Sequence, residues 1–167
     1  MSALEDLVIT TLADVAGRLG VAYEVLPCDP ALADTTAFCA AYGYSLTESA
    51  NTIVVAAKAD PPRYAACVAL ADRRLDVNGL VRRRLEARKV SFASADATVS
   101  LTGMEIGGVT PFGLPAGVPL WIDAAVMEQD RVIVGGGSRA IKIRVGPAAL
   151  AALPGAEVVT DLCAPPG

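Results

Sequence analysis

The chain has 167 residues, of which 53% are hydrophobic and only 5% aromatic, and its formal net charge at pH 7 is −4. That length suits one domain that buries its own core, and no stretch approaches the roughly 18 uncharged apolar residues of a membrane-spanning helix. Histidine is absent and the four cysteines lack metal-binding spacing, which excludes serine–histidine or cysteine–histidine catalysis and argues against a metal site. The acidic N-terminus lacks the basic region of a signal peptide, so we expect one cytoplasmic domain over residues 1–167.

The first quarter of the chain predicts a helix, a strand and a second helix. Ser2 is placed as an N-cap with Glu5 three residues later, a capping box, and apolar residues then recur at helical spacing until Gly20. Alternating residues follow, and a second helical pattern stops at Gly43. The expected elements are a helix over Ser2–Leu19, a strand over Val21–Leu26 and a helix over Ala31–Tyr42.

Two β-rich runs come next, over Thr52–Ala57 and Tyr64–Ala71. The connection between them is rich in turn-forming residues and contains two prolines. Such a spacing is typical of a hairpin, so we expect the two runs to pair antiparallel.

A basic segment follows the predicted hairpin. Eight basic and three acidic side chains lie between Arg63 and Val90, a net charge of +5, whereas the rest of the chain carries −9. Apolar spacing over Val77–Ala87 predicts an amphipathic helix with its arginines exposed. Such a segment can bind a phosphate backbone, but charge runs are also typical of a solvated helix face. The charge pattern alone leaves both interpretations open.

The second half of the chain alternates short predicted strands with glycine-rich connections. Asp96 is placed as the N-cap of a brief helix that ends at Gly103. Met104–Pro119 is too rich in glycine and proline for a helix or central strand, so we expect a loop of fixed shape. The other expected elements are strands over Val90–Ala93, Pro119–Ile122, Arg131–Val134 and Ala140–Val145, a helix over Pro147–Leu153, a strand at Val158 and Val159, and a frayed tail over Cys163–Gly167.

Two glycine-rich loops, over 107–111 and 135–139, are candidates for chemistry without histidine. Backbone N–H groups gathered at one edge of a sheet can form an anion-binding nest or an oxyanion hole. Each loop alone is also consistent with an ordinary tight connection. The second loop lacks the lysine of a P-loop and leads into a predicted strand, which argues against ATP and NAD.

Five short motifs occur in order along the chain: Asn51–Val55, Val90–Phe92, Gly107–Gly113, Trp121–Asp123 and Gly135–Arg139. Together they resemble the YbaK-type, prolyl-tRNA synthetase-associated family, over nearly the whole chain from about Pro30 onward. The resemblance implies a single mixed α/β domain with a strongly curved, mostly antiparallel mixed sheet flanked by helices. It also implies hydrolysis of the ester of mischarged tRNA, chiefly proline tRNA, without a metal or organic cofactor.

The family's Gly-x-x-x-Pro loop bounds its aminoacyl pocket and is matched here by 107–111. The resemblance implies that this backbone holds the ester or the attacking water. Hydrolysis of an activated ester needs oxyanion stabilisation and an oriented water more than a strong base, so a chain without histidine can perform it. The implied catalytic positions are Gly107 and Gly108, and the implied substrate contacts are Val109, Thr110 and Pro111.

One position departs from the family pattern. The family has a lysine immediately before the threonine that opens the first hairpin strand, a lysine tied to substrate binding and activity, and here that position is Asn51. Lys58 lies seven residues along the strand, about 20 Å away, and cannot simply substitute. We keep Asn51 among the catalytic candidates and expect it, with Thr52, to position a smaller or different aminoacyl group.

The remaining assignments each have a structural alternative. Asp123 follows a strand and is placed to orient water or a ribose hydroxyl, or to cap the next turn. The 135–139 loop is assigned to substrate and to the terminal adenosine or its phosphate, or is a surface turn. From this loop we assign Gly136 and Ser138 to substrate and Arg139 to tRNA. For the acceptor stem we assign Arg82, Arg83, Arg88 and Lys89, since phosphate contacts leave little sequence signature.

The leading hypothesis is a trans-acting aminoacyl-tRNA deacylase whose partners are the aminoacylated end of tRNA and an aminoacyl-tRNA synthetase. The alternative is a catalytically silent relative that binds aminoacyl-tRNA, a synthetase or a small acyl ligand. Changing Asn51 to lysine separates them, because it raises activity only where the rest of the site is intact. The sequence does not specify the amino acid, the tRNA or the oligomeric state.

Overall fold

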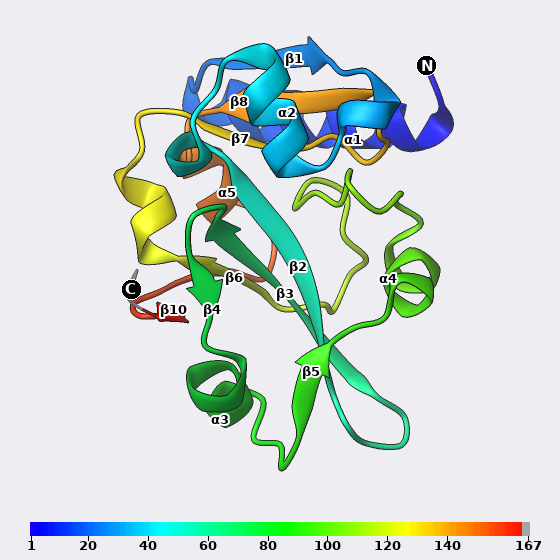
Figure 1. Ribbon diagram of the computed structural model, residues 1–167, viewed down its shortest axis with the longest axis vertical. Coiled ribbons are helices and arrows are strands. Elements are labelled where there is room, and N and C mark those ends of the chain that lie inside the picture. The colour runs from blue at the N-terminus through cyan, green and yellow to red at the C-terminus, as the bar shows by residue number, and fades with distance from the viewer. Residues whose placement is uncertain (165–167) are drawn as a thin grey trace.

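The computed structural model describes residues 1–164, whose helices and strands are shown in Figure 1. The helices are α1 (Ala3–Leu19), α2 (Thr35–Tyr42), α3 (Arg82–Arg84), α4 (Ala95–Thr102) and α5 (Ala148–Ala151). The strands are β1 (Tyr23–Pro27), β2 (Ala50–Ala57), β3 (Arg63–Leu70), β4 (Arg74–Leu75), β5 (Val90–Phe92), β6 (Leu120–Asp123), β7 (Val132–Gly135), β8 (Ile141–Val145), β9 (Ala156–Val159) and β10 (Cys163–Ala164). Among these described residues, no helix is both long and apolar enough to cross a membrane.

The strands form a mixed α/β fold, which confirms the expected class. The largest sheet has the order β5-β2-β3-β6-β9; its first two pairs are antiparallel and its last two are parallel. A second sheet, β1-β8-β7, is antiparallel throughout, and β10 pairs antiparallel with β4. Most pairs are therefore antiparallel, as expected, although the strands are distributed over separate sheets instead of one.

The predicted hairpin is confirmed and lies at the centre of the largest sheet. β2 and β3 pair along their whole lengths, from Ala50 opposite Leu70 to Ala57 opposite Arg63. β5 pairs only with the last three residues of β2, so the first half of β2 has no β5 residue beside it. An isolated bridge joins Ser49, just before β2, to β7. The half of β2 that carries Asn51 and Thr52 thus lies between the two larger sheets.

The hairpin is buried on both faces, which accounts for its nearly continuous apolar sequence. On one face Val68 belongs to a core cluster that also contains Leu12 of α1 and Leu150 of α5. On the other face Cys67 belongs to a cluster formed with the segment that follows β4. A third, smaller cluster attaches α2 to β7 through Phe38.

The N-terminal helix is confirmed, and the second predicted helix is divided. Ser2 and Glu5 form the expected capping box, and Gly20 ends α1 in the left-handed conformation. The chain predicted as one helix over Ala31–Tyr42 contains a 3-10 turn over Pro30–Leu32 and then α2. The Asp29 carboxylate caps the start of the short turn through the Ala31 N–H, and the break lies at Asp34, whose backbone is extended.

Three further predictions are corrected. The segment 77–87 forms a π-helical turn over Val77–Val81 followed by the short α3, because the Asp76 carboxylate accepts the N–H groups of the first turn. Ser94, not Asp96, caps α4, accepting the Ala97 N–H at 3.0 Å. The tail predicted to fray pairs with β4 at Cys163–Ala164, and residues 165–167 lie outside the described chain.

The loop expected over Met104–Pro119 contains no helix or strand and packs tightly against the turn after β7. The Gly137 N–H donates to the Gly108 carbonyl at 2.6 Å, and the Glu105 N–H donates to the Gly137 carbonyl at 2.9 Å. A Cβ atom at Gly108 would collide with the Ser138 carbonyl, and one at Gly135 would collide with the Gly108 and Val109 carbonyls. Glycine is required here because two backbones approach each other directly.

We predict opposite stability changes for two glycine-to-alanine substitutions. Gly108→Ala should lower the free energy of unfolding by about 1–3 kcal/mol, because its methyl group would push the two loops apart. Gly17→Ala, in α1, meets nothing within 4 Å and should raise it by up to about 1 kcal/mol. Urea denaturation measures both changes, and equal midpoints for the two variants would contradict the packing described above.

Candidate functional site

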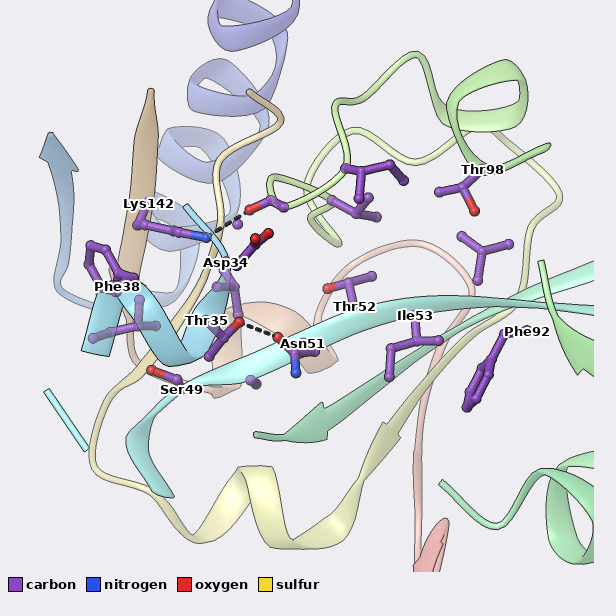
Figure 2. Close-up of a pocket in the computed structure, with 18 of the residues that line it drawn as sticks. Asp34, Thr35, Phe38, Ser49, Asn51, Thr52, Ile53, Phe92, Thr98 and Lys142 are labelled. Carbon is purple, nitrogen blue, oxygen red and sulfur yellow. Dashed lines mark hydrogen bonds between the residues drawn. The ribbon is translucent and has the colours of Figure 1, made fainter. Parts of the chain in front are cut away.

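A cavity of about 300 Å³ lies where β2, β7, α2 and the 106–109 loop meet. Its apolar lining includes the β-branched side chains of Ile53, Val54, Val109, Ile133 and Val134. Its polar lining includes side chains from three separate parts of the chain, shown in Figure 2. These polar residues are Asp34 and Thr35 before and within α2, Asn51 and Thr52 in β2, and Lys142 in β8.

Thr52 places an unsatisfied hydroxyl in this cavity. Its side chain points into the cavity from β2, and the residue is only 8% exposed (Figure 2). The Oγ1 atom is buried and has no hydrogen-bond partner among the described residues. A buried hydroxyl without a partner costs about 1–3 kcal/mol, and such exceptions in a native fold call for an explanation. A bound ligand with a polar atom beside Thr52 supplies one.

Lys142 places a buried positive charge in the same cavity. The residue is 5% exposed, and its ammonium donates to the Ala33 carbonyl at 2.5 Å and to the Gly107 carbonyl at 2.7 Å. The Phe38 ring centre lies 5.6 Å from Nζ. Burial lowers the pKa of Lys142 from its ordinary value. Within residues 1–164 no carboxylate forms an ion pair with this ammonium.

Asn51 and Asp34 lie beside these two groups. The Asn51 Oδ1 atom accepts a hydrogen bond from Thr35 Oγ1 at 2.5 Å, which ties β2 to the start of α2 (Figure 2). Asp34 occupies the N-cap position of α2 but makes no capping bond with its side chain. Its carboxylate is 74% exposed and pairs with Arg139 Nη1 at 3.2 Å. The cavity rim therefore carries a carboxylate that remains accessible to a ligand.

Side chains of the 135–139 turn form hydrogen bonds and an ion pair with neighbouring segments. The Arg139 guanidinium donates to the Pro30 carbonyl at 2.9 Å, the Ile106 carbonyl at 2.8 Å and Asp34. Ser138 Oγ donates to Glu5 of α1 at 3.1 Å. The side chains of Arg139 and Ser138 are bonded to other parts of the protein, and Gly136 does not line the cavity; their assignment to tRNA and substrate stays a prediction.

Four of the predicted catalytic and substrate residues line the cavity, and the others are placed elsewhere. The four are Asn51, Thr52, Gly107 and Val109. The Gly108 N–H, expected to face the ester, donates instead to the Glu105 carbonyl at 2.9 Å. Thr110 is fully buried and Pro111 lines a different pocket, against α1. The predicted loop is thus at the site, but through its Gly107 carbonyl and Val109 and not through a Gly108 donor.

The structure places Asp123 away from the cavity. It is buried at the end of β6, which runs between β3 and β9, and it does not line the cavity. Burial and the neighbouring Asp123 carboxylate together raise the pKa of the Cys163 thiol to about 12. Asp123 occupies the N-cap position of the 3-10 turn over Ala124–Glu128, but its side chain makes no capping bond there. All four cysteines are buried free thiols, and the described residues hold no cluster of potential metal ligands.

Most of the basic segment lies away from the cavity. Val81 and Leu85 anchor it on the sheet face opposite the one from which Thr52 projects. Arg82 Nε donates to the Asn78 carbonyl at 2.9 Å, whereas Arg83 and Arg88 are exposed. Lys89 differs, because it lines a neighbouring pocket that shares Phe92 and Ala93 with the cavity. Of the four residues of this segment that were assigned to the acceptor stem, Lys89 is the one that the fold brings near the cavity.

Sequence reasoning missed Lys142. In β8 it alternates with buried Ile143, as Arg144 does, so the pattern places both basic residues on a solvent-facing side. Arg144 follows that pattern and reaches Glu24 at the surface. Lys142 is buried because the start of α2 and the 107 loop cover it. Only a tertiary contact between distant segments distinguishes the two side chains.

The Thr52 hydroxyl gives a stability prediction. Thr52→Val should leave the free energy of unfolding of the ligand-free protein unchanged or raise it, because no hydrogen bond is lost and a buried unpaired oxygen is removed. Thr102→Val is the matched control. Its buried hydroxyl donates to the Thr98 carbonyl at 2.7 Å and accepts the Met104 N–H at 3.1 Å, so we expect a loss of about 1–3 kcal/mol. Equal losses in the two variants would show that Thr52 already has a partner.

Comparison with known proteins places this geometry in a family. Residues 29–153 match the family described as the aminoacyl-tRNA editing domain. A solved structure of a proposed trans-editing enzyme for prolyl tRNA synthetase is similar, with a TM-score of 0.77, 21% identity, and coverage of 96% of this chain and 97% of that one. The hypothetical protein APE2540 is similar at a TM-score of 0.78 and 25% identity, over 92% and 99% of the two chains. The resemblance drawn from the five motifs is confirmed: the chain belongs to the aminoacyl-tRNA editing domain family.

Proposed function

We propose that this protein is a trans-acting deacylase that hydrolyses the ester of mischarged tRNA in the cytoplasm, with proline tRNA among its targets. The observation that carries the proposal is the cavity of an editing-family domain in which a hydroxyl and an ammonium are both buried without a full set of partners among residues 1–164. Polar groups buried in this way fit a ligand with oxygen atoms, as an aminoacyl ester has.

The reaction needs only water as co-substrate. Water adds to the carbonyl carbon of the ester, and the carbonyl oxygen takes up the negative charge. Collapse then breaks the bond to the ribose oxygen, which leaves with a proton derived from water. The products are the free amino acid and tRNA with a free hydroxyl. Stabilising the charged oxygen is the largest electrostatic task in such a reaction.

The rim of the cavity suits the amino group of the substrate. An aminoacyl ester carries a positively charged α-amino group. The Asp34 carboxylate lies at the rim, makes no capping bond, and is largely exposed beside its partner Arg139. A volume of about 300 Å³ is at the lower end of ligand pockets, which favours a small aminoacyl group. We therefore assign Asp34 to the amino group and the apolar walls to the side chain.

The nucleotide end of tRNA would leave the cavity past β5. Phe92 is 59% exposed and lines both the cavity and the neighbouring pocket that contains Lys89. An exposed aromatic ring can stack on a base, and an exposed lysine can contact a phosphate. We propose these two residues as the first tRNA contacts, with the exposed Arg83 and Arg88 further along the acceptor stem and a synthetase as an additional partner.

The alternative is a silent relative that binds an acyl ligand without cleaving it. Asn51 at the family's lysine position and the occupied Gly108 N–H are the observations that favour it. The two functions differ in turnover and share the cavity. A hydrolysis assay therefore separates them, and binding assays do not.

We predict that the protein deacylates at least one tRNA in a panel charged separately with alanine, cysteine, serine and proline. Thr52→Val should lower kcat/KM by about 10-fold or more, since one hydrogen bond to a polar substrate group is worth about 0.5–1.5 kcal/mol and more when the group is charged. Asn51→Lys should raise activity. If the folded wild type and Asn51→Lys both leave every ester intact, the silent alternative replaces the deacylase for these substrates.

Removal of the Lys89 charge should weaken tRNA binding without regard to the amino acid attached. For Lys89→Gln we expect the slope of log K against log salt to fall by about 0.7–0.9, the value for one phosphate contact. Filter binding at several salt concentrations measures this slope. Arg18→Gln, on the exposed part of α1, is the control and should leave the slope unchanged. Identical slopes for all three proteins would remove Lys89 from the tRNA surface.

A further inference from the structure

The Lys142 ammonium has more hydrogen-bond donors than its two carbonyl partners use. An ammonium has three N–H donors, and two of them are used by the Ala33 and Gly107 carbonyls. Among residues 1–164, the third has no acceptor, and Lys142 lines the cavity. One donor of a buried cation is therefore available to a ligand.

Within the described part of the chain, the charge of Lys142 also has no carboxylate in an ion pair with it. Buried charges in proteins are normally paired or bound to a metal, because leaving water costs several kcal/mol. The nearest carboxylate of the rim, Asp34, is paired with Arg139 and lies largely in solvent. A neutral side chain would satisfy two carbonyls at lower cost. The placement of a cation here points to a ligand atom that carries negative charge.

The other donors expected at this loop are already in use. The Gly108 N–H bonds to Glu105, and the Gly137 N–H bonds to the Gly108 carbonyl. An oxygen that becomes negative in the cavity therefore cannot use either of these backbone donors. Lys142 from β8 and Thr52 from β2 both line the cavity with donor capacity left over among residues 1–164, and Lys142 is the cationic side chain of that lining.

We propose that the Lys142 ammonium binds the carbonyl oxygen of the scissile ester and stabilises the negative charge that forms on it, with the Thr52 hydroxyl as a second donor. This inference rests on the proposed deacylase function and names its principal catalytic residue. Water attacks as described above, and Lys142 keeps its proton throughout. The Gly107 carbonyl fixes the direction of the ammonium, so the 107 loop contributes an acceptor and not an oxyanion donor.

The test compares wild type with Lys142→Gln on the tRNA that wild type hydrolyses best. Glutamine keeps an N–H donor for the carbonyls but carries no charge. We expect kcat to fall about 10²–10³-fold, the usual effect of losing one oxyanion donor, with KM within about threefold. Binding of a 3′-amide analogue of the aminoacyl end should weaken much less than kcat falls, because its carbonyl oxygen accepts a hydrogen bond but develops no charge. Arg18→Gln is the control for a lost surface cation.

A second variant separates charge from structure. Lys142→Ala removes the atoms of propylamine from the cavity, so added propylammonium should restore part of kcat and 1-propanol, of the same shape but neutral, should not. Unfolding midpoints show whether each variant is folded. If both alcohol and amine restore activity, or if folded Lys142→Gln retains the kcat of wild type, Lys142 is a structural clamp and the inference is wrong. If wild type itself cleaves no ester, the proposed function fails, and this inference falls with it.

Discussion

The site depends on the direct packing of two backbones, the loop that begins at Glu105 and the turn that ends at Ser138. Glycines at the contact points let the carbonyl and N–H groups of the two segments meet without intervening side chains. This contact holds the Gly107 carbonyl over β8, where it accepts from Lys142. The position of the 107 loop over the cavity and the orientation of the Lys142 ammonium both follow from this one glycine-dependent contact.

A second feature is the way in which the site gathers groups from distant segments. Asn51 is held by a hydroxyl from α2, Lys142 by carbonyls before α2 and after Ile106, and Asp34 by a guanidinium from the turn after β7. Each bond joins elements that are far apart in sequence. The pocket is consequently a product of the assembled fold, and no single motif contains it.

This distribution explains what could be predicted from the sequence. Local signals were sufficient for α1, for the β2-β3 hairpin and for the irregular 104–119 loop, because a capping box, strand alternation and glycine content act over a few residues. The family motifs pointed to Asn51, Thr52, Gly107 and Val109, and all four line the cavity. They also suggested Asp123, Ser138 and Arg139, whose polar atoms are turned toward protein partners by contacts that no local pattern encodes. Lys142 was not predicted as a site residue, because strand alternation placed it with Arg144 on a face expected to be exposed, whereas the fold buries it.

The β-branched walls of the cavity have a consequence for selectivity. Valine and isoleucine have few rotamers available in strands, and those of β2 and β7 are fixed by sheets on which the rest of the core packs. These side chains have few other rotamers with which to make room for a larger ligand group. Each extra carbon therefore costs a ligand about 1–3 kcal/mol of binding free energy in this cavity, so that the shape of the walls sets a graded limit on ligand size.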